Sequence, residues 1–295
     1  MPRIGLNAHL LSPSQTYRNA GVSRYVLELM MHLPQVDPDT DYVAFVGDRR
    51  NQFEGWCQHL SPWPTRRPPA RILWEQGLQG LSARRAKLDL LHAPVYVGPM
   101  HFGCPLVVTI HDLSFLLYPH LFRPFNRRYL QYFTRRTVER AAGIIAVSAS
   151  TRDDVVRLLG VDERRIAVIP NGVNTCMRPV EDPGQIEALR RRHDLPERMI
   201  LFLGTLEPRK NVVSLLEAYH LLVRERDLEQ HLVIAGAKGW YYERIYATVD
   251  RLGLGSRVSF PGYIPQEEMP LWYSAADLFV YPSIYEGFGL PPLEA

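Results

Sequence analysis

The sequence predicts an α/β protein made of two doubly wound parallel-sheet domains in tandem. Short runs rich in Val, Ile and Leu alternate along the chain with segments of helical periodicity, as expected for parallel strands covered on both faces. The chain has 295 residues, 46% of them hydrophobic and 22% charged, which suits a globular protein with two domains. A Pro- and Gly-containing stretch without periodicity, residues 174–184, separates two such series and predicts a linker.

The first series predicts a sheet with helices between its strands. We place its strands at residues 3–8, 41–47, 88–93, 105–112, 143–150 and 165–173. We expect its helices at residues 21–33, 124–142 and 150–159. In the first of these helices the apolar side chains fall on one face, at Val22, Tyr25, Val26, Leu29, Met30 and Leu33. Residues 1–178 therefore make the first predicted domain.

The second series restarts the alternation after the linker. We expect strands at residues 199–206, 231–236, 257–263 and 277–283. We expect helices at residues 184–193, 211–226, 240–252 and 266–275. Residues 179–295 make the second predicted domain, and ligands of such sheets bind at the carboxyl ends of the strands.

Composition limits the partners and the compartment. A net charge of +3 suits an anionic ligand or a membrane surface but is too small to indicate a nucleic-acid partner. Three cysteines without metal-type spacing indicate free thiols in a reducing compartment, and we expect them to be buried. No run of about 18 apolar residues is present, so we expect neither a signal peptide nor a spanning helix. The protein is predicted to be cytoplasmic, with membrane association on the cytoplasmic face left open.

Three loops at predicted strand ends stand out: "PGYIP", which ends the strand at 257–263, and two loops that carry charged residues. The strand at 199–206 runs into "EPRKN", which places Arg209 and Lys210 directly before a helix, an arrangement that suits a diphosphate. A solvated basic helix start is the alternative, although cations there oppose the helix dipole. The other charged loop, "YEGFGLPPLEA", sets Glu286 and Glu294 around a glycine turn that leads into a helix start. Backbone N–H groups converge at such a start and form half of an anion site.

The motifs together resemble those of one enzyme family. The combination of "GTLEPRKN", "VIAGAKGW", "VSFPGYIPQEEMPLWYSAADLFVYPS" and "YEGFGLPPLEA" resembles the donor domain of retaining GT-B glycosyltransferases of family 4, including mannosyltransferase-like members. In the first series, "GVSRY", "VTIHDL", "AVSAST" and "VIPNGV" resemble the acceptor-side signatures. The resemblance covers the whole chain and implies two Rossmann-like domains that face a cleft. The family's donor domain continues beyond the last motif, so we expect the second domain to be incomplete here and the chain truncated.

The resemblance also implies roles for particular residues. Arg209 and Lys210 match the pair that holds the donor's diphosphate and stabilises it as it leaves. Glu286 and Glu294 match the two glutamates of an E-x7-E motif, the first expected on hydroxyls of the donor sugar and the second on the ribose. His111 matches a histidine beside the reacting sugar, with a structural histidine near a strand end as the alternative. The implied donor-binding residues are Gly21, Gly204, Tyr263, Ile264, Gly287, Phe288, Gly289, Leu290 and Glu294.

The roles of Gly21 and Glu286 leave alternatives open, and Asp112 is given a structural role. Gly21 allows close approach of backbone to donor phosphate or acceptor, or serves as a plain helix N-cap. Asp112, next to His111, is expected to cap the following turn. No carboxylate pair is placed like a glycosidase acid and nucleophile, so we expect a front-face reaction with retention, with Glu286 as a covalent nucleophile the alternative.

The predicted function is transfer of a mannose-like hexose from a nucleotide-diphosphate sugar to a sugar or lipid-linked acceptor in polysaccharide biosynthesis. GDP-mannose is favoured as donor by the resemblance alone. A nucleotide-sugar epimerase of GT-B architecture and a truncated, non-catalytic nucleotide-sugar-binding protein are the alternatives. We expect no cofactor and no metal, because the D-x-D pairs formed by Asp37, Asp39 and Asp41 precede a strand and indicate a turn.

A basic aromatic segment suggests a contact with membranes. Residues 120–140 interleave six arginines with five aromatic residues. A basic amphipathic helix of this kind can lie on an anionic membrane, which would suit a lipid-linked acceptor. The alternative is a core-facing aromatic stripe with a solvated arginine face.

Overall fold

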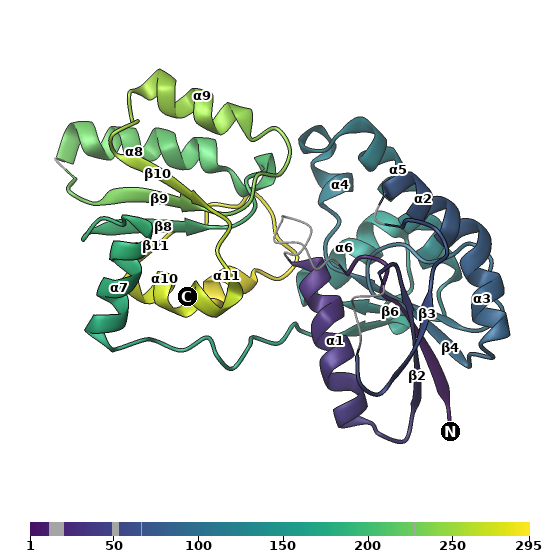
Figure 1. The fold of residues 1–295 in the computed structure, drawn as a ribbon. Helices are drawn as coiled ribbons and strands as arrows, with labels where there is room; N and C mark the ends of the chain where they lie inside the picture. Colours follow the sequence, from purple (N-terminus) through teal and green to yellow (C-terminus); the bar gives the residue numbers. More distant parts are fainter. Residues whose placement is uncertain (12–20, 49–52, 66, 227) are drawn as a thin grey trace. The chain divides into compact units, whose positions relative to one another are not determined.

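The computed structural model describes residues 1–11, 21–48, 53–65, 67–226 and 228–295, and its described part forms two compact units (Figure 1). The first unit extends to Asn171 and the second begins at Gly172. Both are parallel α/β units, as the sequence predicts. In the described part of the chain no helix is long and apolar enough to cross a membrane.

The first unit is built on a seven-stranded sheet with the order β3-β2-β1-β4-β5-β6-β7. Its strands are β1 (Arg3–Asn7), β2 (Asp41–Val46), β3 (Trp56–Leu60), β4 (Leu90–Ala93), β5 (Leu106–Ile110), β6 (Gly143–Ala146) and β7 (Ile166–Val168). All the pairs are parallel, and Ile4 of β1 lies opposite Tyr42 on one side and Leu90 on the other. The strand order reverses between β1 and β4, the position at which open sheets of this type leave a crevice beyond their carboxyl ends.

Helices cover both faces of this sheet. They are α1 (Val22–Val36), α2 (Pro68–Leu73), α3 (Gln79–Arg85), α4 (Ser114–Leu117), α5 (Pro124–Arg140) and α6 (Ala149–Leu159). Helix α1 turns Val26 and Met30 inward against Leu6 and Ala44, which confirms the face predicted for it. A second cluster joins Val108 and Ile110 of β5 to side chains of α3, α5 and α6. The strands read as continuous apolar runs because both of their faces are buried in this way.

This unit differs from the sequence prediction in several features, among them the short helices α2, α3 and α4, where no helix was predicted. Strand β3 was not predicted, because its polar sequence "WCQHL" has one uncovered face at the sheet edge. The alternation along this strand buries Trp56 and exposes Cys57. The expectation of buried cysteines is therefore wrong for Cys57 and also for the exposed Cys176, whereas Cys104 is half-buried against the core.

The second unit is built on a four-stranded sheet with the order β10-β9-β8-β11. Its strands are β8 (Met199–Leu203), β9 (His231–Ala235), β10 (Val258–Gly262) and β11 (Leu278–Phe279), and its helices are α7 (Pro183–His193), α8 (Val212–Arg226), α9 (Glu243–Leu252), α10 (Met269–Ala275) and α11 (Leu290–Glu294). Helices α8 and α9 cover one face of the sheet, and α7 and α10 cover the other (Figure 1).

The burial of strand β8 explains why an apolar run in the sequence predicted it. Its five residues are all buried. Phe202 packs with Leu216 of α8, and Leu201 packs with Trp272 of α10. The strand predicted at 277–283 pairs only over Leu278–Phe279, because β11 is the last strand of the described sheet and has β8 as its single neighbour.

The carboxyl ends of β8 and β9 approach each other unusually closely. Gly236 has φ +141°, and a Cβ built on it would lie 1.8 Å from the carbonyl oxygen of Gly204. Beyond this point the backbone N–H of Leu206 donates to the carbonyl of Ala237 at 2.9 Å. Only a residue without a side chain permits this approach, which sets the course of the loop after β8.

We expect Gly236→Ala to destabilise the second unit, because the new methyl group must displace backbone and the residue must keep a left-handed φ. The expected loss is about 2–4 kcal/mol in the free energy of unfolding, measured by urea denaturation. Gly255→Ala is the matched control, because a Cβ there meets nothing within 4 Å. We expect the control to stay within about 1 kcal/mol of the parent protein. Equal urea midpoints for the two variants would contradict the close approach.

Candidate active site

The loop after β8 places two cations directly before helix α8. Pro208–Lys210 forms a single 3-10 turn, and Asn211 follows in the left-handed region with φ 56°. Asparagine tolerates that conformation better than most residues, so the chain can reverse there and begin α8 at Val212. Arg209 and Lys210 therefore lie at the carboxyl end of β8, where the sequence placed them.

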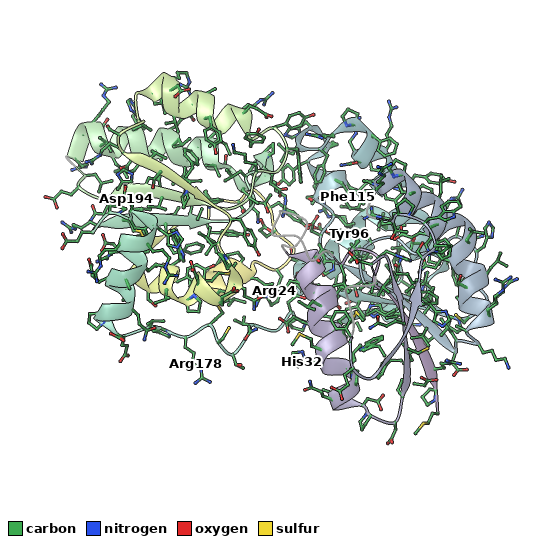
Figure 2. All side chains as sticks on the ribbon, viewed as in Figure 1. Arg24, His32, Tyr96, Phe115, Arg178 and Asp194 are labelled. Atoms are coloured by element: carbon green, nitrogen blue, oxygen red, sulfur yellow. The ribbon has the colours of Figure 1, made fainter. Side chains whose placement is uncertain are left out.

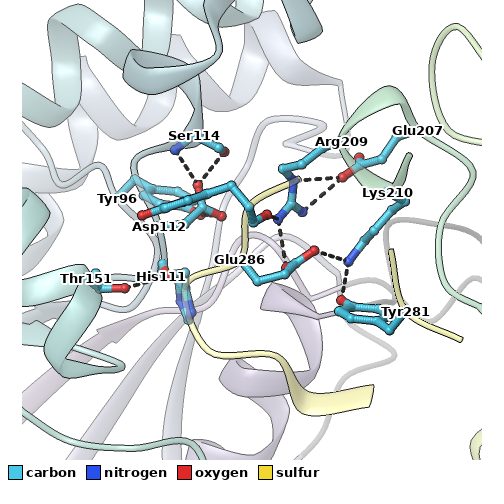
Figure 3. Close-up of polar contacts among 11 residues, drawn as sticks. Tyr96, His111, Asp112, Ser114, Thr151, Glu207, Arg209, Lys210, Tyr281 and Glu286 are labelled. Carbon is cyan, nitrogen blue, oxygen red and sulfur yellow. Dashed lines mark hydrogen bonds and ion pairs between the residues drawn. The ribbon is translucent and has the colours of Figure 1, made fainter. Parts of the chain in front are cut away.

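One carboxylate joins these two cations. Glu286 accepts a hydrogen bond from Nη1 of Arg209 through Oε2 at 2.8 Å and from Nζ of Lys210 through Oε1 at 2.7 Å (Figure 3). The backbone N–H of Ile284 donates to the carbonyl of Arg209 at 2.9 Å, which holds the two loops together. The structure thus brings Glu286 to the predicted catalytic pair Arg209 and Lys210, which lie 77 and 76 positions before it in the sequence.

A second carboxylate, Glu207, completes the cluster. Its Oε1 accepts from Nε of Arg209 at 3.1 Å and lies 2.9 Å from Nη2 of the same side chain. The carboxylate is 5% exposed, so it holds the guanidinium from a buried position while Glu286 approaches from another side. Two cations and two carboxylates balance one another in formal charge.

Burial sets the protonation behaviour of this cluster. Desolvation lowers the pKa of Lys210, although the charge of Glu286 opposes the shift. Desolvation also raises the pKa of Glu207, against the opposing charge of Arg209. For Glu286 burial alone would raise the pKa, but Arg209 and Lys210 together outweigh it and hold the pKa below its ordinary value. Glu286 is therefore ionised at neutral pH and is the counter-ion of the cation pair.

Tyr281 is a member of this cluster that sequence reasoning missed. Nζ of Lys210 donates to its hydroxyl at 2.6 Å and lies 4.8 Å from the centroid of its ring. Burial and the charge of Glu286 raise the pKa of this phenol, which keeps it neutral. The sequence placed Tyr281 inside a strand expected at 277–283, whereas the pairing of β11 ends at Phe279. Glu207 lies within "EPRKN", at a predicted strand end, but was given no role.

The predicted donor-binding residues of the second unit are placed in different ways. Gly204 follows β8, and a Cβ built on it would lie 3.9 Å from Cε of Lys210. Gly289 takes a left-handed φ of 87° before the short helix α11, whose Leu290 is the first residue, and Gly287 and Phe288 precede it in the same turn. Glu294 lies on α11 and accepts from the hydroxyl of Tyr273 at 3.3 Å.

Two residues predicted for the base pocket differ in their exposure. Tyr263 follows β10 and is half-buried. The side chain of Ile264 is 3% exposed and packs in the core with Met199 and Trp272. Ile264 therefore offers its backbone rather than its side chain to a ligand, and its predicted role stays a prediction.

In the first unit, His111 follows β5 and is enclosed by aromatic rings. Its Nε2 lies 2.8 Å from the carbonyl oxygen of Pro94, and its ring centroid lies 4.7 Å from that of Tyr25 and 5.7 Å from that of Tyr96. Burial lowers the pKa of His111, so the imidazole is neutral at neutral pH. A carbonyl can only accept, so Nε2 carries the proton and Nδ1 is left as an acceptor.

The neighbours of His111 are fixed by short-range hydrogen bonds. Asp112 accepts from the backbone N–H of Ser114 at 2.9 Å and from the hydroxyl of Tyr96 at 3.1 Å, which confirms that it caps the following turn. Tyr96 also packs edge-on against Phe115, with ring centroids 5.7 Å apart (Figure 2). Gly21 precedes α1 with φ 53°, and a Cβ there would meet nothing within 4 Å.

The two parallel α/β units and the cation pair beyond β8 define the class as GT-B glycosyltransferases. Residues 19–176 match the family described as Glycosyltransferase Family 4, and residues 185–295 match the family described as Glycosyl transferases group 1. The chain belongs to glycosyltransferase family 4. The resemblance seen in the motifs is thereby confirmed for the family and the fold.

Curated relatives and solved structures agree with this assignment. The O-antigen chain mannosyltransferase B of Escherichia coli is 31% identical over 95% of this chain and 77% of its own length. The serotype-specific mannosyltransferase WbdA of Escherichia coli is 34% identical, over 64% of this chain and 24% of its own length. Sucrose-phosphate synthase from Thermosynechococcus elongatus has the same fold with a TM-score of 0.77 and 21% identity, covering 100% of this chain and 78% of that one.

We expect Glu286→Gln to destabilise the second unit, because it leaves two largely buried cations without their shared counter-ion. The expected loss is about 1–3 kcal/mol at pH 7 in urea denaturation, discounted for the 20% exposure of the side chain. Glu217→Gln, which removes an exposed ion pair with Arg251, is the control and should stay within about 0.5 kcal/mol.

The stabilisation that Glu286 contributes to the folded state decreases as the pH falls. The folded-state pKa of Glu286 lies below its ordinary value, so its stabilisation is present above about pH 4.3 and is lost as the pH falls through the folded-state pKa. The difference between the parent protein and Glu286→Gln should therefore shrink in acid. A difference that is constant between pH 7 and pH 3 would contradict the counter-ion role.

Proposed function

We propose that this glycosyltransferase moves a mannose-like hexose from a nucleotide-diphosphate sugar to a sugar or lipid-linked acceptor, with retention of configuration. The single observation that carries the proposal is the pair of cations Arg209 and Lys210, held at a strand end by one shared carboxylate. Fixed cations of this kind suit a diphosphate, whose charge grows as it leaves. The mannosyltransferase names of several relatives, among them O-antigen chain mannosyltransferase RfbU of Salmonella typhimurium, support the choice of sugar.

In this proposal Glu286 changes partners when the donor binds. Both of its oxygens are bonded to the cations, so an arriving diphosphate competes with it for Arg209 and Lys210. A carboxylate released from the cations can then accept hydrogen bonds from hydroxyls of the donor sugar. Glu207 stays bonded to Arg209 during this exchange, so the guanidinium keeps its orientation.

The chemical step proposed here is a front-face transfer. Glu286 is a weak nucleophile because the cations lower its pKa and occupy both oxygens, which disfavours a covalent glycosyl intermediate. In a front-face transfer the leaving phosphate oxygen accepts the acceptor's proton while Arg209 and Lys210 stabilise the negative charge. Neutral His111 offers Nδ1 as an acceptor to a hydroxyl of the reacting sugar. Charge stabilisation by these side chains fits a reaction without a metal ion.

A thermal-shift panel tests the donor. We expect one of GDP, UDP and ADP, or its sugar conjugate, to raise the melting temperature, because a ligand that binds only the native state stabilises it. At about 100 times the dissociation constant the gain is about 2.7 kcal/mol. GDP-mannose is the conjugate that we expect to act. The Arg209→Ala, Lys210→Ala double variant should lose the shift.

The matched control for this panel is the Arg224→Ala, Arg226→Ala double variant. Both arginines are exposed in the last turn of α8, so the control removes the same charge from the same unit. It should keep the nucleotide shift. A shift that survives in the Arg209, Lys210 variant, or that disappears in both, would refute a diphosphate site on this pair.

Peripheral contact with an anionic membrane on the cytoplasmic side is the second part of the proposal. Helix α5 turns Thr134, Thr137 and Val138 inward. Phe125 and Tyr132 on the same helix are 64% and 56% exposed. The other two aromatic residues of the helix, Tyr129 and Phe133, are half-buried, and exposed arginines accompany the exposed rings, as in helices that lie on membranes.

Flotation with phosphatidylglycerol-containing vesicles tests this contact. We expect binding that falls with added salt and that is weakened by Arg128→Glu with Arg135→Glu, since each basic residue near the surface contributes about 1 kcal/mol. Reversing Arg224 and Arg226 to Glu is the control and should leave binding unchanged. No flotation of the parent protein at low salt would remove the membrane contact and leave the transferase assignment intact.

A further inference from the structure

The two cations beyond β8 share one partner, and each also has a partner of its own. Nε of Arg209 donates to Oε1 of Glu207 at 3.1 Å, and Nη1 of the same side chain donates to Glu286 at 2.8 Å. Nζ of Lys210 donates to the hydroxyl of Tyr281 at 2.6 Å and to Glu286 at 2.7 Å (Figure 3). Glu286 is thus bonded to both cations, whereas Glu207 holds the first and Tyr281 the second.

The two carboxylates of the cluster differ in their access to solvent. The side chain of Glu207 is 5% exposed and that of Glu286 is 20% exposed. A buried carboxylate that leaves its cation is costly, because no water replaces the lost partner. Glu286 lies within residues 280–289, which link β11 to α11 without helix or strand. Of the two carboxylates, Glu286 is therefore the one that can be exchanged for a ligand.

Both cations keep their positions when Glu286 leaves them. Arg209 retains its contacts with Glu207, whose Oε1 also lies 2.9 Å from Nη2. Lys210 retains the hydroxyl of Tyr281 and the face of its ring, whose centroid lies 4.8 Å from Nζ. An anion that takes the place of Glu286 therefore meets cations that are already oriented.

The cost of displacing Glu286 depends on what the released carboxylate can bond to. A diphosphate takes away its two charged donors and places like charge next to it. A donor that still carries its sugar supplies hydroxyl groups, which can donate to the carboxylate in their place. The nucleotide diphosphate left after transfer has no sugar hydroxyls at that end. The same carboxylate therefore opposes binding of the product more than binding of the donor.

We propose that Glu286 distinguishes the donor from its product: it bonds to the sugar while the donor is bound, and returns to Arg209 and Lys210 after transfer, displacing the nucleotide diphosphate. This inference rests on the proposed transferase function and assigns product release to a residue of the same site. A carboxylate that only bound the sugar would not affect the affinity for a diphosphate, whereas an internal competitor lowers it. The two roles therefore predict different results when the charge of Glu286 is removed.

Isothermal titration calorimetry with pyrophosphate tests this competition on the whole chain, independently of the nucleotide base. We expect Glu286→Gln to bind pyrophosphate roughly 10- to 100-fold more tightly than the parent protein, because hydrogen bonds between charged groups no longer have to be broken. GDP should show a gain of the same order. Glu217→Gln removes one negative charge from an exposed ion pair in the same unit, so it is the matched control and should bind both ligands as the parent does.

The preference for donor over product gives a second measurement. The parent protein should bind GDP-mannose about 10-fold or more tightly than GDP, and Glu286→Gln should lose most of this preference. The ratio compares two ligands on one protein, so a lower stability of the variant does not change it. A cooperative melting curve of Glu286→Gln shows that the variant is folded during the titrations.

Two outcomes would overturn the inference while leaving the diphosphate site in place. The first is pyrophosphate binding by Glu286→Gln that is equal to or weaker than that of the parent protein. The second is equal affinity of the parent protein for GDP and GDP-mannose. A gain with pyrophosphate, without binding of GDP or GDP-mannose, would support the competition and contradict the guanosine donor alone. No binding of pyrophosphate to either protein would refute both the diphosphate site and this inference.

Discussion

The second unit depends on one electrostatic constraint: two adjacent, largely buried cations require a counter-ion. Glu286 supplies it by bonding to Arg209 and Lys210 with separate oxygens, and Glu207 holds Arg209 from its other side. Removing such charges from water is costly unless they are paired. The loop after β8 and the loop after β11 are therefore tied together by the same groups that are proposed to receive the diphosphate.

The sheet makes this arrangement possible. Strand β8 lies between β9 and β11, so the loops that follow β8 and β11 leave the same edge side by side. The contact of Gly236 with the carbonyl of Gly204 brings the loop after β9 against the loop after β8. The cations thus lie on a backbone fixed from both sides, as the proposed stabilisation of a leaving phosphate requires.

The first unit presents a different chemistry at its own switch point. Its polar groups, Arg71 and Glu75 among them, offer donors and acceptors rather than a concentrated positive charge. The small hollow that they line also borders Pro94 and Tyr96, which contact the neutral imidazole of His111.

Local sequence patterns were enough to predict the two parallel sheets, the family and the loops that carry Arg209, Lys210, Glu286 and His111. It could do so because strands buried on both faces produce apolar runs, and because these side chains follow strand ends directly. The folded chain was needed to show that Glu286 bonds to both cations, that Tyr281 bonds to Lys210, and that Arg71 and Glu75 lie with Asn7 and Tyr129 around one hollow. Periodicity records which face of an element is buried, whereas contacts between residues far apart in the chain depend on strand order and loop course, which no local pattern encodes.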